Sequence, residues 1–233
     1  MKKILSLLLT TVSLIMFATV KMDPVFGSHM VLQQEKPISF FGTAVPNSKV
    51  TVEFNSKIVS AGVDAQGRWT AVFPAMKASK TPFTVSVTDG KTTIKLDDIL
   101  IGEVWFCSGQ SNMSMPIGKK FVRGWSAQNC EQEVANANYP EMRFAVQKSV
   151  ASHNSILPAN NVGGWFKCTP QVAHTLSATA YFFGRKLHQD LDVPIGLIRA
   201  SWSGSAIEPW ISNDGYHKFG PAKDSQLVKK IYF

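Results

Sequence analysis

Cysteine is scarce in this chain, with 3 among 233 residues. None has the spacing of a metal site, which argues against a cysteine metal centre, and the odd number leaves at least one thiol without a partner within the chain. Cys107 ends an apolar run, where we expect a buried free thiol. For Cys130 and Cys168 two states stay open: a disulfide in an oxidising compartment, or two free thiols.

Charge is low and evenly spread. Charged residues make up 17% of the chain, and the formal net charge of +8 is not gathered in any long block. The densest basic stretches, KFVRGW and QLVKKIYF, are short and isolated, so we expect a solvated basic surface and no nucleic-acid partner. The hydrophobic content of 45% is ample for a buried core.

Long apolar runs are absent except at the N-terminus. Lys2 and Lys3 precede an apolar run from Ile4 to Val20, which has the form of a secretory signal peptide over residues 1–20. An uncleaved anchor is the alternative for this segment. No later apolar segment is long enough to span a membrane. We therefore expect the folded part of the chain to be secreted or periplasmic.

Residues 24–98 have an all-β pattern. Val50, Val52 and Phe54 alternate with Thr51 and Glu53, as on a half-buried strand. The stretches DAQG and TDGK are typical of hairpin turns, with glycine available for positive φ and aspartate serving the turn geometry. Short strands separated by such turns predict a β-sandwich module.

The pattern changes after residue 98. ILIGEVWFC is a nearly continuous apolar strand, as expected when a strand is buried on both faces of a parallel sheet. A helical pattern then begins after Ser177 or Thr175 and leads through Pro194 into a second apolar strand, IGLIRAS. This predicts an α/β domain over residues 99–233. We expect the two regions to be separable, with no continuous sheet across their boundary.

The stretch EVWFCSGQSNMSMPIG runs from an apolar strand end into a small polar turn. Its residues 104–107 are expected to be buried, and residues 108–112 form the turn. A serine in such a turn, just after a strand, has the usual layout of a nucleophile held above a sheet. Gly109 lets the backbone turn, and Ser111 would need a base and oxyanion donors to react.

The wider block GEVWFCSGQSNMSMP closely resembles the nucleophile block of the sialate O-acetylesterase family, which belongs to the Gly-Asp-Ser-like (SGNH) hydrolases. Upstream, MVLQQEKPISFFGTAVPNSKVTV and GRWTAVFPAM are similar to that family's N-terminal β-domain. Downstream, LSATAYFFGRKLHQDLDVPIGLIRASWSGSAIEPW is similar as well, so the resemblance covers residues 23–212. It implies a β-sandwich joined to a flavodoxin-like α/β hydrolase domain that is incomplete here.

The resemblance also implies roles for single residues. Ser111 matches the nucleophile, and its own backbone N–H would be one oxyanion donor. The family's Trp-Gly-Gly-Thr loop stands here as residues 202–205, in which Gly204 would supply a second donor although serine replaces the first glycine. Gln110 and Asn112 flank the nucleophile and are assigned to the oxyanion and substrate side of the site. No metal or organic cofactor is implied.

The family's acid and base are missing from the sequence. Its Gln-Gly-Glu-Ser-Asn block does not occur, and the chain ends at Phe233 before an Asp-x-x-His pair would follow, so it looks like the first part of a longer protein. Asp214 and His217 fit Asp-x-x-His but come too early, and we interpret them as a decoy. Glu208 and Trp210 match a family Glu-x-Trp segment and are expected to pack and form a local salt bridge. The other histidines, which we expect to be exposed or remote rather than basic catalysts, are His29, His153, His174 and His188.

The leading hypothesis is a carbohydrate O-acetylesterase that forms an acetyl-enzyme on a serine. Its ligand would be an O-acetylated sugar, either a sialic acid or a polysaccharide. Two alternatives stay open: an esterase for acetylated xylan or a similar polysaccharide, and a non-catalytic glycan-binding protein. Because no family-matched base is present, we expect this chain by itself to be a poor esterase.

Overall fold

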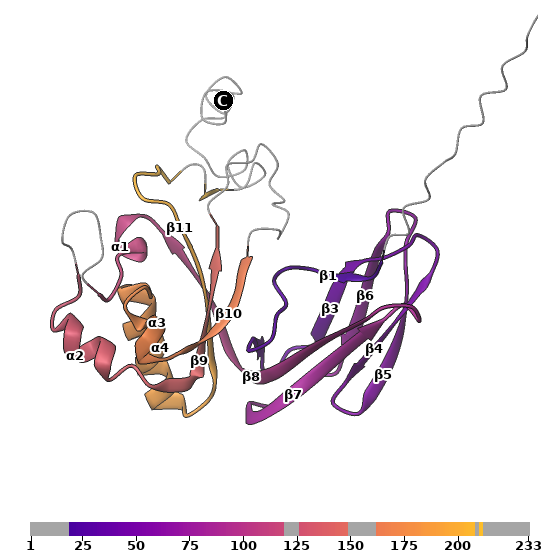
Figure 1. The fold of residues 1–233 in the computed structure, drawn as a ribbon, viewed down its shortest axis with the longest axis horizontal. Helices are drawn as coiled ribbons and strands as arrows, with labels where there is room; N and C mark the ends of the chain where they lie inside the picture. The colour runs from indigo at the N-terminus through magenta and orange to yellow at the C-terminus, as the bar shows by residue number, and fades with distance from the viewer. Residues whose placement is uncertain (1–18, 119–125, 149–161, 208–209, 212–233) are drawn as a thin grey trace, which may run out of the picture.

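The computed structural model describes residues 19–118, 126–148, 162–207 and 210–211 of the chain. Their strands form a three-stranded sheet in the order β1-β3-β6 and an eight-stranded sheet whose path is β10-β9-β11-β8-β7-β4-β5, with β2 beside β8. Figure 1 shows the two ends of the large sheet in different surroundings: one end faces the small sheet, and helices cover the other. The molecule is therefore a mixed, sheet-rich fold.

The first half is two β layers around a shared core. Alternation places Val50, Val52 and Phe54 inward, each at most 1% exposed, where they meet Phe40 and Trp69 from the small sheet. The aromatic rings pack edge to face, with the Phe40 and Phe54 centroids 5.2 Å apart. The strands of this half are β1 (Lys21–Met22), β3 (Ile38–Thr43), β4 (Lys49–Phe54), β5 (Lys57–Gly62), β6 (Arg68–Phe73) and β7 (Ser79–Thr88).

Two turns of this half follow the sequence pattern closely. Gly67 and Gly90 have φ of 78° and 86°, which favours glycine. The Asp64 carboxylate accepts backbone N–H bonds from Arg68 and Gln66, and these bonds lower the pKa of Asp64. Asp89 likewise accepts bonds from two amides of its turn. The predicted role of these aspartates in turn geometry is confirmed.

The second half begins within β8 (Thr93–Gly109) and contains a short parallel sheet. β11 (Ile195–Ser201) lies between β8 and β9 (Tyr139–Gln147) and runs parallel to both. α4 (Ala178–Leu191) packs on β11 and β9, and the Ser177 side chain caps it by accepting the Ala180 N–H at 3.2 Å. The remaining elements are β2 (Val31–Gln33), α1 (Ser111–Ser114), α2 (Cys130–Ala135), β10 (Val162–Cys168) and α3 (Pro170–Ala173).

A single strand joins the two halves. β8 is 17 residues long; it pairs with β7 as far as Ile101 and with β11 from Glu103 onward. At the change of partner, Gly102 lies so close to the Pro194 carbonyl that a Cβ there would clash with it. The expectation that no continuous sheet crosses residues 98–99 is wrong, because the strand exchanges neighbours instead of ending. The buried residues still form two hydrophobic cores, although the first core also includes Ala145 and Trp165 from the second half.

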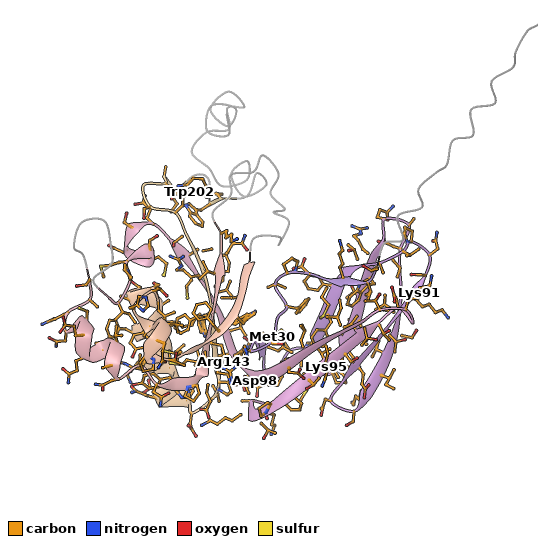
Figure 2. All side chains as sticks on the ribbon, in the orientation of Figure 1. Met30, Lys91, Lys95, Asp98, Arg143 and Trp202 are labelled. Carbon is orange, nitrogen blue, oxygen red and sulfur yellow. The ribbon has the colours of Figure 1, made fainter. Side chains whose placement is uncertain are left out.

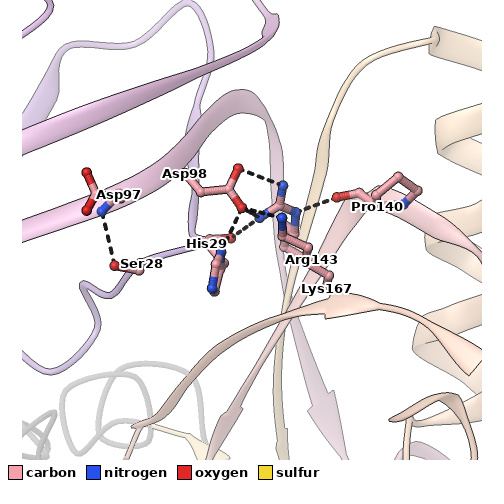
Figure 3. A network of polar contacts seen from close by, with 7 residues as sticks. All are labelled: Ser28, His29, Asp97, Asp98, Pro140, Arg143 and Lys167. Atoms are coloured by element: carbon pink, nitrogen blue, oxygen red, sulfur yellow. Dashed lines mark hydrogen bonds and ion pairs between the residues drawn. The ribbon is translucent and has the colours of Figure 1, made fainter. Parts of the chain in front are cut away.

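A cluster of charged side chains fixes this junction (Figure 3). The Asp98 carboxylate, at the junction in β8, accepts bonds from Arg143 at 2.9 and 3.2 Å, and it lies 2.7 Å from both Lys167 Nζ and His29 Nδ1. Arg143 is only 3% exposed and also donates to the Pro140 carbonyl. Burial of Asp98 opposes its ionisation, but the bonds from Arg143, Lys167 and His29 outweigh it and hold the pKa of that carboxyl well below its usual range.

The end of β8 departs from the expected burial. Cys107 is buried, but Trp105 and Phe106 are 43% and 64% exposed. Among the described residues, β8 pairs beyond Gly102 with β11 on one side alone, so one edge of this segment and part of its surface stay open. The prediction that residues 104–107 are a buried strand end is therefore wrong for Trp105 and Phe106.

The three cysteines and Val20, near the start of the described residues, are buried. Cys107, Cys130 and Cys168 are all buried and free, so the disulfide alternative is not formed here. Val20, within the predicted signal segment, is 2% exposed and donates its N–H to Asp89. Within the described residues, no helix combines the length and the apolar character that a membrane crossing requires.

Candidate active site

Two parallel strands end side by side at one edge of the large sheet. In the register of β8 and β11, Gly109 lies opposite Ser201. The segments that follow, α1 after β8 and the loop after β11, therefore emerge next to each other beyond the carboxyl ends of the strands (Figure 1). In open α/β sheets this is where ligand sites form.

Ser111 is the first residue of α1 and lies in this position. Its side chain is partly exposed and does not belong to either core. The turn before it requires glycine, because Gly109 has φ of 153° and its Cβ position lies 3.3 Å from Met113 Cβ. The chain thus leaves the strand abruptly and presents the Ser111 hydroxyl at the sheet edge.

The loop that carries Gly204 is tied to the same turn. The Trp202 N–H donates to the Gly109 carbonyl at 3.0 Å, and the Gln110 side-chain amide donates to the Ser205 carbonyl. Gly204 itself has φ of 80°, and no heavy atom lies within 4 Å of its Cβ position. The residues on both sides of Gly204 are therefore held against the turn that precedes Ser111, with open space at the glycine.

α1 is also anchored from its other side. Thr179 Oγ1, in the first turn of α4, donates to the Asn112 carbonyl at 3.0 Å. Ser114 Oγ donates to Ser201 Oγ at 2.9 Å, which joins α1 to the end of β11. These bonds give the short helix fixed neighbours although it spans only 4 residues.

The structure thus brings Ser111, Gln110 and Gly204 into one place. The Gln110 side chain holds the Gly204 loop through its bond to Ser205. The sequence did not predict this role, because a glutamine in a turn does not indicate which distant residue it will contact. Asn112 is exposed, and its carbonyl, rather than its side chain, makes the contact with α4. The chemical roles of these residues stay predictions. Trp210 donates its indole N–H to Ser205 Oγ at 2.9 Å.

No histidine of the described residues is hydrogen-bonded to Ser111. His29 bonds Asp98, and His188 Nδ1 bonds the Val193 carbonyl. His174, at the end of α3, has no side-chain bond to Ser111 either. The expectation that His174 and His188 are exposed is wrong, because both are partly buried. The other candidates from the sequence lie outside the described residues: His153, Glu208, Asp214 and His217.

The described residues do not form a metal site. In the described segments, no group of three or more His, Cys, Asp or Glu side chains is placed to hold a metal ion. The arrangement at the sheet edge is instead one of hydroxyl, amide and backbone groups. It presents a partly exposed serine hydroxyl and an open glycine loop at the same end of the sheet, and groups of these kinds are used in acyl transfer.

Comparison with a solved structure indicates the class of protein that this chain resembles. The structure is similar to that of a carbohydrate acetylesterase from Xanthomonas citri, with a TM-score of 0.76, 30% sequence identity, and coverage of 82% of this chain and 42% of that one. Fold and sequence together therefore group the chain with carbohydrate esterases.

Sequence comparison finds homologues among the sialate O-acetylesterases. The sialate O-acetylesterases of Mus musculus and Homo sapiens are 32% and 31% identical to this chain over 203 and 219 residues. The chain is a homologue of the sialate O-acetylesterases over most of its own length, as the nucleophile block predicted. The aligned part is 36% and 40% of these two relatives, so the chain spans less than half of their length. No protein-family model matches the chain.

Proposed function

We propose that this chain carries the nucleophile portion of a carbohydrate O-acetylesterase, with Ser111 as the nucleophile. The observation that carries the proposal is the position of Ser111 at the carboxyl end of a parallel strand, with the Gly204 loop bonded to the turn before it. Homology to esterases supports it. In this proposal the first half is a β-sandwich module, and the second half is part of an SGNH-type hydrolase domain.

The proposed chemistry is acyl transfer in two steps. Ser111 Oγ loses its proton to a base and attacks the acetyl carbonyl, and the resulting oxyanion accepts bonds from the N–H groups of Ser111 and Gly204. Collapse of this intermediate releases the sugar hydroxyl, which takes up the proton, and leaves an acetyl ester on Ser111. Water then attacks that ester, releasing acetate and restoring the serine.

The base is the part of this mechanism that the described residues do not supply. None of their histidines hydrogen-bonds Ser111, and the homologous enzymes are much longer than this chain. A serine site without its base typically loses about 10⁴ to 10⁶ in turnover. We therefore expect slow acetylation of Ser111 and slower deacetylation when this chain acts alone.

The substrate in this proposal is an O-acetylated sugar, either a sialic acid or an acetylated polysaccharide such as xylan. A signal peptide over residues 1–20 and a secreted or periplasmic location are part of the same proposal, since such sugars lie outside the cytoplasm. A second candidate function is glycan binding without catalysis. It is favoured by two observations: no described histidine hydrogen-bonds the Ser111 hydroxyl, and the indole of Trp202 is exposed.

The test is acetylation of the full chain by p-nitrophenyl acetate, with peptide mass spectrometry to locate the acetyl group. We expect the label on Ser111, its absence from Ser111→Ala, and its retention in Ser108→Ala. Ser108 is a matched control because it is an exposed serine near the end of β8, three residues before Ser111. Equal acetylation of wild type and Ser111→Ala would exclude Ser111 as the nucleophile and leave glycan binding as the better function.

A further inference from the structure

Two indoles are exposed beside the candidate active site. Trp202 follows the end of β11 and is 46% exposed, and Trp210 is 39% exposed. Figure 2 shows Trp202 at the free end of the second half, beyond the ribbon of β11 and away from the two cores. Large apolar side chains that stay in water next to a reactive turn are typical of a binding surface.

A single hydroxyl links these two residues. Ser205 Oγ donates to the Trp202 carbonyl at 2.8 Å and accepts the Trp210 indole N–H at 2.9 Å. The Trp210 ring is thereby fixed at its polar edge, while its faces need no polar partner. The Trp202 backbone is fixed as well, since its N–H bonds the Gly109 carbonyl two residues before Ser111. Both indoles thus have fixed anchor points close to the nucleophile.

Among the described residues, the second half has one further exposed tryptophan, which differs from these two. Trp105 is 43% exposed, but its ring packs edge to face on Phe183 with centroids 5.2 Å apart. No such aromatic partner contacts the rings of Trp202 and Trp210 among the described residues. Trp105 therefore serves as a matched control for exposure without proximity to the site.

Among the described residues, the polar groups near the two indoles are neutral; Glu208, between them in sequence, lies outside those residues. The segments that build the site, residues 108–115 and 200–207, contain serine, glycine, glutamine and asparagine but no charged residue. The nearest cation in the sequence is Arg199, which is half-buried and lies in register with Cys107 two residues before the strand ends. A neutral, hydroxyl-rich ligand fits such a surface better than an anionic one.

We infer that Trp202 and Trp210 form a stacking platform for an uncharged pyranose ring, which makes a neutral acetylated polysaccharide the substrate rather than a sialic acid. The inference rests on the proposed function and deepens it. A pyranose presents an apolar face of C–H groups that packs on an indole, and its hydroxyls bond the surrounding serines and amides. The ring would thereby be held with its ester group near Ser111 Oγ.

The experiment is isothermal titration of the full chain with an unacetylated xylo-oligosaccharide and, separately, with N-acetylneuraminic acid. We expect the xylo-oligosaccharide to bind more tightly than the sialic acid. Its affinity should fall on the order of tenfold in Trp202→Ala, recover largely in Trp202→Phe, and stay unchanged in Trp105→Ala. Thermal melts of the variants establish that each is folded.

Three outcomes would overturn the inference. The first is that Trp202→Ala binds the oligosaccharide as tightly as the wild type does. The second is that the wild type does not bind the oligosaccharide. The third is that the wild type binds N-acetylneuraminic acid more tightly than the oligosaccharide and that Arg199→Ala loses this binding. The proposed function fails separately. If the wild type binds the oligosaccharide but p-nitrophenyl acetate does not acetylate Ser111, the chemistry is wrong and the platform stands.

Discussion

The Trp202 amide donates a hydrogen bond to the Gly109 carbonyl at 3.0 Å, across the ends of two neighbouring parallel strands. This bond joins the loop after β11 to the turn that presents Ser111. The two segments are nearly a hundred residues apart in sequence, and the parallel register of β8 and β11 is what brings them together. The candidate site is thus a product of the sheet topology.

Replacing Gln110 by alanine should slow the acetylation of Ser111. The Gln110 amide bonds the Ser205 carbonyl, so its removal loosens the loop that carries Gly204. A misplaced oxyanion donor costs on the order of 100-fold in rate. The acetylation rate with p-nitrophenyl acetate measures this, with Gln66→Ala in an exposed β-turn as control. An unchanged rate in Gln110→Ala would mean that the Gly204 loop takes no part in the chemistry.

Asp98→Asn should destabilise the fold by about 3 kcal/mol, because it leaves the buried Arg143 guanidinium without its carboxylate. Urea unfolding at neutral pH measures this loss. The neighbouring Asp97→Asn is the control, since its ion pair with Lys95 is largely exposed and should contribute less than about 1 kcal/mol. Equal losses in the two variants would show that the junction cluster is not specially stabilising.

The same carboxylate predicts a pH dependence. The pKa of Asp98 is lower in the folded state than in the unfolded chain, so the unfolded state binds its proton first. Its stabilisation is fully present above about pH 4 and is lost progressively as the pH falls further toward the folded pKa. In urea unfolding at a series of acidic pH values, the wild type should therefore approach Asp98→Asn in stability. A constant difference between them down to low pH would contradict this assignment.

The three cysteines should behave as buried free thiols. Burial raises the pKa of the Cys168 thiol to about 12 and raises that of Cys107 as well. We expect no reaction of the native protein with iodoacetamide and labelling of all three thiols once the chain is unfolded without reductant. Labelling of Cys107 alone after unfolding would show that Cys130 and Cys168 are joined in a disulfide.

The open edge of β8 should promote self-association. Phe106 is 64% exposed on the segment of β8 that, among the described residues, pairs with β11 alone. Phe106→Lys adds a charge at this edge and should reduce the association measured by light scattering. Leu191→Lys, at the exposed end of α4, is the control and should change association little. Equal effects of the two variants would mean that general apolar exposure, and not the strand edge, drives association.

Local patterns predicted much of the fold. The alternation at Val50, Val52 and Phe54, the glycine turns and the Ser177 cap all appear where the sequence indicated them, because each depends on residues close together in the chain. The exposure of Phe106 and the change of partner at Gly102 were not predictable in this way. They depend on which strands lie beside β8, and an apolar run does not encode its neighbours.

In the candidate site, as in the fold, local features were predictable and contacts between distant residues were not. Ser111 was predicted as the nucleophile from its turn and from the resemblance of its surrounding block to known esterases, and that role stays a prediction. The tether from Gln110 to Ser205 and the shared hydroxyl between Trp202 and Trp210 were missed. These contacts join residues by side-chain geometry, which no spacing in the sequence reports. The junction at Asp98 and Arg143 was missed for the same reason, since its two residues lie on different strands.

Whether Ser111 is the nucleophile of a carbohydrate esterase can be tested by acetate release from an acetylated xylo-oligosaccharide, using a hybrid of this chain and the remaining C-terminal part of the Xanthomonas citri relative. Circular dichroism first establishes that the hybrid is folded. We expect turnover by the hybrid, a loss of about 10⁴-fold or more when Ser111 is replaced by alanine, and near-background rates for this chain alone. Turnover that survives Ser111→Ala in the folded hybrid would show that Ser111 is not the nucleophile.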